Sequence, residues 1–455
     1  MSLQHFLLAS LLSVALHLAA CELDEAATLS QISSDGAVHP QSASKAIHAS
    51  PERGSHMVFA CHGMMGDPSD MKPLLEALQQ LSEESNQRRL HKNEVRTVRT
   101  RFHNIVAHEP HTLWQRLTLT TRGVAHGGTA VAHEILTVLE NNPDVTSLSL
   151  IGFSLGGMYM RLAAGLLLPL HPTSPRRPAN SAVARADRFQ RLAQTRVVDF
   201  NAYISIATPH VGVRGYLNPL FSLIMRQGWL GQLGRDLAWD PPATWTACEA
   251  FHALCKQPRE YSLADAAALS QAPILLQMAS PQGVYWRALA NFRSRTAVGN
   301  EVWDRSVPYF TATLAPAPHW LSSQHAIGLG LKAWAIPATP GRDDTPLDPH
   351  FTGAWVQREA EWQQDEDTVS QRVVAWASAL HTATVGPEVG PEVAQAAALR
   401  AAGGWLTVNA KWDDWLAYLL NHNRIIGKAW LTPWADCSGF LTVLSRVVAH
   451  RLQSG

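Results

Sequence analysis

The chain has 455 residues, of which 46% are hydrophobic and 16% charged, a composition typical of a globular protein and unlike that of a disordered one. Its 37 Lys and Arg residues are balanced by 37 Asp and Glu residues. This balance gives no support to nucleic acid as a partner, because proteins that bind polyanions carry an excess of basic residues. The five cysteines lack the close spacing of a zinc site, so they predict no metal.

The first 21 residues form an apolar N-terminal segment that resembles a secretory signal. Residues 6–20 are mostly apolar and end in Leu-Ala-Ala before Cys21, but no Lys or Arg precedes them. An uncleaved anchor and an ordinary apolar terminus remain alternatives. The segment favours the secretory pathway or the extracellular space, with the cytoplasm or a lipid droplet as the alternative location. Residues 22–54 are expected to form a linker.

From residue 55 onward, short apolar runs alternate with stretches of helical periodicity. We predict strands at residues 56–61, 95–102, 147–151, 198–207, 295–299 and 405–410. We predict helices at residues 74–81, 123–139, 158–168 and 435–452. This alternation predicts an α/β fold, with a mostly parallel central sheet and helices on both of its faces.

Two segments interrupt this alternation. Residues 212–273 look helical and apolar without obvious strands, and we expect them to form a lid or a plain helical cap. Residues 315–404 fit the sheet badly. Within them, apolar residues recur every seven positions, which predicts an amphipathic helix that packs on the body or, alternatively, contacts lipid. The stripe consists of Trp355, Trp362, Val369 and Trp376.

The sequence Gly152-Phe153-Ser154-Leu155-Gly156 matches the G-x-S-x-G pattern of a nucleophile elbow. An apolar strand enters this turn and a helix leaves it, which is the setting that the elbow requires. Its glycines let the strand and helix backbones pass closely, while the serine hydroxyl is lifted above the sheet. The pattern therefore predicts an α/β-hydrolase domain over residues 55–455, with Ser154 as the nucleophile.

A serine nucleophile needs two N–H donors for the oxyanion that forms during acyl transfer. One should be the backbone N–H of Leu155, directly after the nucleophile. We assign the second to the backbone N–H of Met64, because a glycine-containing loop follows the first strand there. Nearby His62 is interpreted as a turn residue, with a metal ligand or an acid/base role as the alternatives.

The fold also requires an acid and then a histidine after Ser154, in that chain order. Both Glu301 and Asp304 follow the strand at residues 295–299, and Asp304 is the preferred acid. His422 is the first histidine after the last strand and is the preferred base. His450 lies within the final predicted helix and is less suited to the role.

Five segments in chain order resemble the putative serine esterase family of eukaryotic lipase-like α/β-hydrolases, which includes lipid-droplet phospholipases and acylglycerol lipases. They are HGMMGDPSDM at 62–71, GFSLGGMYMR at 152–161, ISIATPHVG at 204–212, DRSVPYFTA at 304–312 and HNRII at 422–426. The chain departs from the family where Phe153 replaces the usual histidine before the nucleophile and Met71 replaces the usual tryptophan.

This resemblance implies a carboxylic ester hydrolase whose catalytic residues are Ser154, Asp304 and His422. It implies acylglycerol or phospholipid substrates and transient contact with a membrane or lipid-droplet surface. A catalytically inactive scaffold remains an alternative, as does an acyltransferase or thioesterase that uses the same three residues. No cofactor is expected, because the glycine-rich stretches lack the lysine of a phosphate-binding loop.

Overall fold

A computed structural model describes most of the predicted hydrolase domain. The described residues are 54–91, 99–107, 120–174, 187–213, 230–238, 272–281, 283–300, 304, 306–314, 354–358, 391–400, 402, 405–410, 422, 425–426 and 438–453. The predicted signal, the linker and most of the predicted lid lie outside these residues.

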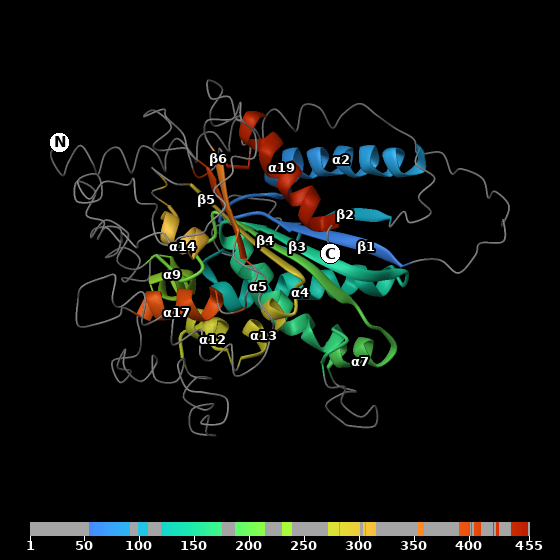
Figure 1. Cartoon of the computed structure of the whole chain (residues 1–455). Coiled ribbons are helices and arrows are strands. Elements are labelled where there is room, and N and C mark those ends of the chain that lie inside the picture. The colour runs from blue at the N-terminus through green and yellow to red at the C-terminus, as the bar shows by residue number, and fades with distance from the viewer. Residues whose placement is uncertain are drawn as a thin grey trace, which may run out of the picture.

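The centre of the molecule is a seven-stranded sheet with the strand order β2-β1-β3-β4-β5-β7-β6 (Figure 1). Neighbouring strands are parallel, except that β6 runs antiparallel to β7. The strands are β1 (Ser55–Cys61), β2 (Thr100–Asn104), β3 (Val145–Phe153), β4 (Asp199–Ile206), β5 (Ser294–Asn300), β6 (Ala354–Arg358) and β7 (Trp405–Ala410). All six predicted strands are present, although β2 lies later in the chain than the apolar run at 95–102 indicated.

Helices cover both faces of this sheet, which confirms the predicted α/β-hydrolase architecture (Figure 1). Two of them, α2 (Lys72–His91) and α19 (Ser438–Gln453), lie side by side on one face. The other face carries α4 (Val124–Asn141), α5 (Leu155–Leu167), α7 (Arg188–Thr195), α9 (Gly231–Ala238), α12 (Ile274–Ala279), α13 (Val284–Ala290) and α17 (Pro391–Arg400). Among the described residues, no helix is both long and apolar enough to span a bilayer.

Successive side chains of the strands point to opposite faces of the sheet and pack into two hydrophobic cores. On β1, Phe59 packs into the core beneath α4 and α5, whereas Val58 packs into the core beneath α2 and α19. Both side chains are fully buried, as is typical of a sheet covered on both faces. Each large apolar side chain buried in this way stabilises the fold by roughly 1.5–3 kcal/mol.

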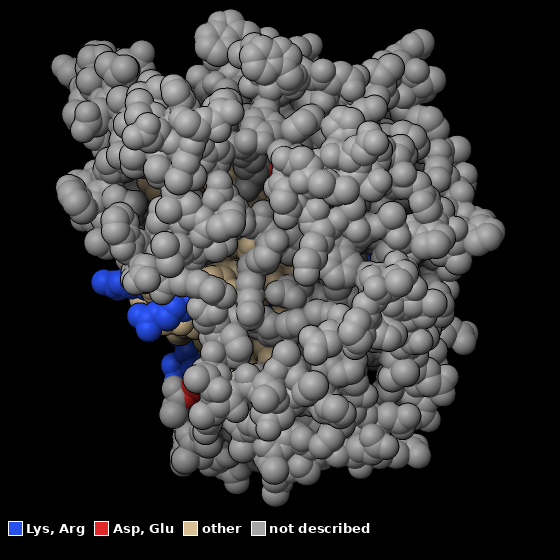
Figure 2. Space-filling view, turned by 90° about the vertical axis from the view of Figure 1, so that its left-hand side faces the viewer, with Lys and Arg blue, Asp and Glu red and all other residues tan. Residues whose placement is uncertain are grey.

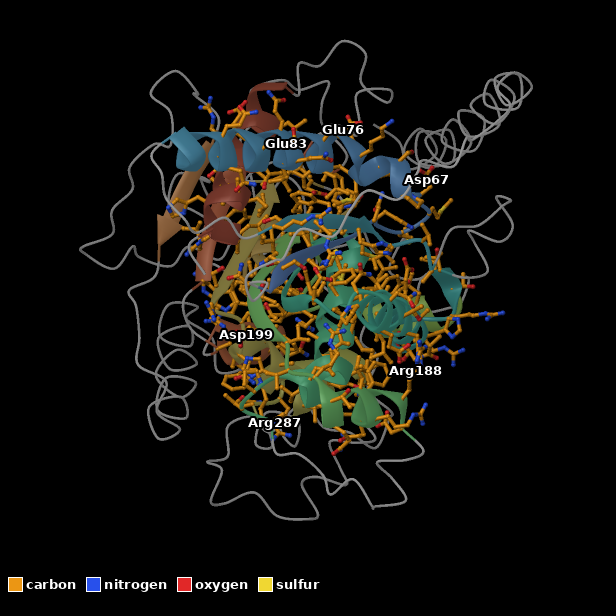
Figure 3. All side chains as sticks on the ribbon, turned by 90° about the vertical axis from the view of Figure 1, so that its right-hand side faces the viewer. Asp67, Glu76, Glu83, Arg188, Asp199 and Arg287 are labelled. Atoms are coloured by element: carbon orange, nitrogen blue, oxygen red, sulfur yellow. The ribbon has the colours of Figure 1, made fainter. Side chains whose placement is uncertain are left out.

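Helix α2 shows how the sequence pattern selects one face for the core. Leu74 and Leu78, one turn apart, are buried against the sheet. Glu76 and Glu83 are exposed and lie on the outer side of the helix (Figure 3). On the face that Figure 2 shows, most of the Lys and Arg side chains that can be seen lie at one margin.

The prediction that residues 315–404 fit the sheet badly was wrong at one place. Ala354–Arg358 forms edge strand β6, so Trp355 lies in a strand and not in the predicted amphipathic helix. Pairing with β7 gives this segment backbone hydrogen bonds between strands, and a periodicity of apolar residues carries no information about such pairing. Helix α17 also packs on the body, since the indole N–H groups of Trp286 and Trp405 donate to the carbonyls of Ala398 and Leu399. The rest of the stripe lies outside the described residues.

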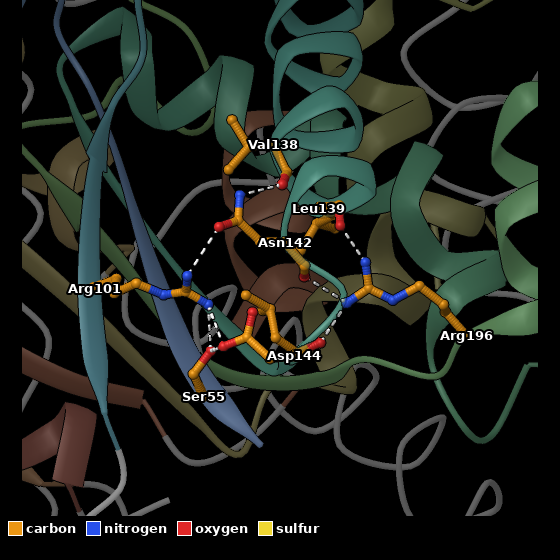
Figure 4. A network of polar contacts seen from close by, with 8 residues as sticks. Ser55, Arg101, Val138, Leu139, Asn142, Asp144 and Arg196 are labelled. Carbon is orange, nitrogen blue, oxygen red and sulfur yellow. Dashed lines mark hydrogen bonds and ion pairs between the residues drawn. The ribbon is translucent and has the colours of Figure 1, made fainter. Parts of the chain in front are cut away.

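A polar network closes the turn between α4 and β3, at the amino end of the sheet (Figure 4). The guanidinium of Arg196 donates to the backbone carbonyls of Leu139, Asn142 and Val145. It thereby adds a second donor to the carbonyls of Leu139 and Asn142, which also accept from the backbone N–H groups of Asn142 and Val145. On the other side of the turn, Arg101 donates to Asn142 and Asp144.

We expect Arg196→Ala to lower the free energy of unfolding by about 1–3 kcal/mol, because it removes three hydrogen bonds from a charged donor that join the end of α4 to the start of β3. Urea denaturation would measure this loss. Arg287 is an exposed arginine, labelled in Figure 3, and Arg287→Ala is the matched control, expected to stay within about 0.5 kcal/mol of the wild type. Equal stability of the two variants would contradict the role given to Arg196.

Candidate active site

The structure brings the three predicted catalytic residues together at the carboxyl ends of the parallel strands. Ser154 follows β3, Asp304 follows β5 and His422 follows β7. The Ser154 hydroxyl lies 2.8 Å from His422 Nε2, although 268 positions separate the two residues. His422 Nδ1 lies 2.9 Å from a carboxylate oxygen of Asp304. The alternative base, His450, is exposed on α19, and the alternative acid, Glu301, lies outside the described residues.

Ser154 occupies a strained turn between β3 and α5. Its φ of 51° and ψ of −125° are unusual for any residue other than glycine, and such a conformation costs about 1–3 kcal/mol. The backbone N–H of Ser154 donates to the carbonyl of Ile206 on β4 at 2.7 Å. This bond ties the turn to the sheet and leaves the side chain free to point toward His422.

Glycines are required around this turn because three backbone segments approach one another. A Cβ on Gly152 would lie 2.3 Å from the Cα of Gly157, where strand β3 passes helix α5. A Cβ on Gly156 would lie 2.3 Å from the carbonyl oxygen of His62 and 2.4 Å from that of Cys61. The amino end of α5 therefore packs directly on the carboxyl end of β1, a position that no side chain can occupy.

The loop after β1 passes beside the serine. A Cβ on Gly63 would come within 2.8 Å of the Ser154 Cβ, so the backbone just before Met64 is adjacent to the nucleophile turn. The side chain of Met64 is 41% exposed. Buried His62 uses Nδ1 to donate to the carbonyl of Gly63 at 3.0 Å, which is consistent with a residue that shapes the turn.

Asp304 is held as a carboxylate by several donors. One oxygen accepts from the backbone N–H groups of Ser306 at 3.0 Å and Val307 at 2.9 Å. The other accepts from the Asn300 amide at 2.8 Å and from His422. Burial alone would raise the pKa of this carboxyl group, but the interactions with His422, Val307 and Asn300 outweigh it and hold the pKa below its usual value. Asp304 is therefore ionised at neutral pH.

This ionised partner fixes the tautomer of His422. A carboxylate can only accept, so Nδ1 must carry the proton that it shares with Asp304. In the neutral ring, Nε2 is then an acceptor, and the Ser154 hydroxyl donates to it. A histidine in this tautomer is ready to take the serine proton.

A second buried serine–histidine pair lies nearby with the opposite polarity. His210 Nε2 is 2.7 Å from the Ser205 hydroxyl, and His210 Nδ1 is 3.2 Å from the guanidinium of Arg161. Because arginine can only donate, Nδ1 accepts, and Nε2 carries the proton that points at Ser205. Burial and the charge of Arg161 keep the pKa of His210 well below its usual value. This pair cannot activate its serine as a base, and it serves to join α5 to the segment after β4.

One open groove in the described part of the chain is separate from this site. It has a volume of about 560 Å³ and lies between α2, β2 and α4, where Gln79, Arg101 and Phe102 contribute to its walls. Ser154, Asp304 and His422 do not line it.

Comparison with known families agrees with the fold and with this serine turn. The family model described as "Putative serine esterase (DUF676)" matches residues 51–317, which is more than half of the chain. The chain belongs to this putative serine esterase family. The matched range contains Ser154, Asp304 and the loop after β1, and it ends before His422. No curated protein matches the chain.

Several features of the site in this member of the serine esterase family were not predicted from the sequence. Asp304 accepts from the backbone N–H groups two and three positions later, which is a recognisable turn pattern. This pattern could have indicated how the carboxylate is held. By contrast, nothing local to the sequence indicates that Asn300 reaches Asp304 or that Phe153 stacks on His422. Among the described residues, no cluster of three or more His, Cys, Asp and Glu side chains could hold a metal ion.

We expect Gly156→Ala to lower the free energy of unfolding by about 3 kcal/mol or more, because the new methyl group collides with two backbone carbonyls that no rotamer change can move. Urea denaturation, followed by circular dichroism, would measure the loss. A variant within about 1 kcal/mol of the wild type would show that α5 does not pack on the end of β1 as described.

Proposed function

We propose that this chain is a serine hydrolase that cleaves carboxylic esters through an acyl-enzyme on Ser154. The observation that carries the proposal is the hydrogen-bonded chain from Ser154 through His422 to Asp304. Membership of the putative serine esterase family supports it independently of His422, which lies outside the matched range. The scaffold alternative is disfavoured, because all three groups are retained in hydrogen-bonding geometry.

In the proposed reaction, the Ser154 hydroxyl oxygen attacks the carbonyl carbon of the ester while His422 Nε2 takes its proton. Asp304 stabilises the imidazolium that forms. The tetrahedral intermediate then collapses, the alcohol leaves with the proton from His422, and the acyl group remains on Ser154. In the second half, His422 takes a proton from water, the hydroxide attacks the acyl-enzyme, and the carboxylic acid is released as Ser154 regains its proton.

Two backbone donors are proposed to stabilise the negative charge on the former carbonyl oxygen. Leu155 is the first residue of α5, so its N–H has no acceptor within the helix and remains available. The positive end of the helix dipole lies at the same place. Met64 follows Gly63, whose backbone is adjacent to Ser154, and its N–H is the second proposed donor. Removal of one such donor typically costs 10²–10³-fold in turnover.

We further propose that the acyl group comes from a lipid, an acylglycerol or a phospholipid. The exposed side chain of Met64 places an apolar group next to the nucleophile turn, where an acyl chain would leave the site. The predicted apolar lid at residues 212–273 and transient contact with a membrane or lipid-droplet surface belong to the same proposal. An acyltransferase or a thioesterase would use the same acyl-enzyme with a different acceptor or leaving group.

Labelling with a fluorophosphonate probe tests the nucleophile and its base. We expect the wild type to be labelled, and Ser154→Ala and His422→Ala to lose labelling. Asp304→Asn should reduce turnover of a p-nitrophenyl ester by roughly 10⁴-fold, because the amide reverses the tautomer of His422. Labelling of folded Ser154→Ala at the wild-type rate would refute the assignment.

The matched control is Ser205→Ala, which removes the serine of the second pair. It should keep its labelling, although loss of the acceptor for His210 should cost about 1–3 kcal/mol of stability. The assay is therefore run at a temperature at which circular dichroism shows the variant folded.

Rates on p-nitrophenyl esters of increasing acyl length test the lipid part of the proposal. Each methylene buried in the transition state contributes about 0.8 kcal/mol, so kcat/KM should rise by up to roughly 15-fold between acetate and butyrate and continue to rise toward octanoate. Ser154→Ala supplies the background rate. A maximum at acetate would identify a short-chain esterase instead.

A further inference from the structure

The ring of Phe153 connects two parts of the candidate site. It is only 3% exposed and belongs to the core beneath α2 and α19. On one side, a Cβ on Gly63 would come within 3.2 Å of the ring, so the ring lies against the loop after β1. On another side it stacks on the imidazole of His422, with ring centroids 5.0 Å apart and planes inclined by 36°.

This stacking restrains a motion of His422 that its hydrogen bonds allow. The bonds to Ser154 and Asp304 hold the two ring nitrogens. A ring held at two points on its edge can still tilt about the line that joins them. Contact with the ring of Phe153 restrains that tilt, which changes the direction in which the Nε2 lone pair points toward the serine hydroxyl.

The same contact also favours a positive charge on His422. In the proposed reaction, His422 becomes an imidazolium when it takes the serine proton. The face of a phenyl ring carries partial negative charge and attracts a cation placed over it. Its attraction therefore grows on the way to the transition state, which favours turnover more than substrate binding.

We propose that Phe153 is a positioning residue for the reaction, one that orients His422 and stabilises its imidazolium form. This inference rests on the proposed hydrolase function. It assigns a role to a position at which the chain departs from the histidine usual in the family.

The test compares two substitutions at Phe153 with one at a distant phenylalanine. Phe153→Leu removes the ring and keeps an apolar side chain, whereas Phe153→Tyr keeps the ring. Phe189→Leu is the matched control, since Phe189 is 8% exposed and stacks on His133 at 5.1 Å, away from Ser154. The readouts are kcat and KM on a p-nitrophenyl ester, the rate of fluorophosphonate labelling, and the melting temperature.

We expect Phe153→Leu to lower kcat and the labelling rate by about 3- to 20-fold with KM within about twofold of the wild type. Phe153→Tyr should restore most of kcat, and Phe189→Leu should lower the melting temperature with kcat unchanged. If the tyrosine variant does not fold, Phe153→His supplies the second flat ring and is expected to exceed the leucine variant in kcat.

Three results would overturn the inference alone, all with an active wild type: unchanged kcat in Phe153→Leu, a loss carried by KM, or ring-bearing variants no better than leucine. A merely structural role predicts that kcat follows the melting temperature in all variants, Phe189→Leu included. A folded wild type that neither hydrolyses esters nor reacts with the probe would instead refute the proposed function, and the inference with it.

Discussion

The site depends on how closely three backbone segments approach one another at the turn between β3 and α5. Ser154 adopts a left-handed φ of 51°, and its hydroxyl emerges above the sheet only because of this conformation. The strain is tolerated because the segment is fixed on both sides. Gly156 packs on the carbonyls at the end of β1, and the N–H of Ser154 donates to Ile206 on β4. The core around the sheet therefore supports a turn that would be unfavourable on its own.

The sequence was informative where local pattern and fold coincide. The elbow motif at 152–156 and the apolar run before it predicted that Ser154 lies between a strand and a helix. Short-range sterics determine the turn, and burial determines the apolar strand. Chain order within the fold left Glu301 and Asp304 as candidate acids and pointed to His422 as the base, and the family resemblance then favoured Asp304 and His422. Strand β6 was missed, because five residues on the edge of a sheet need no alternating apolar pattern. In addition, Trp355 belongs to a seven-residue spacing of apolar residues that predicts a helix. Contacts such as that between Phe153 and His422 depend on tertiary structure that local sequence does not encode.

The two serine–histidine pairs show that a third group determines whether the histidine can take a proton from its serine. His422 faces a carboxylate and His210 faces a guanidinium, so the two rings carry their protons on opposite nitrogens. The pair with Asp304 can accept a proton from its serine, whereas the pair with Arg161 can only donate to it. Distance alone does not distinguish them, since the nitrogen–oxygen separations are 2.8 Å and 2.7 Å.

The separation of 268 positions between Ser154 and His422 has a consequence for biosynthesis. The strained serine turn, its two flanking strands and the loop after β1 are all complete once the first half of the chain has left the ribosome. The proposed base is then still missing, because it follows β7, which pairs with β5 only after more than 400 residues are made. A nascent chain can therefore fold the elbow before its proposed base is in place, and the proposed hydrolysis has to wait until the last parallel strand has paired.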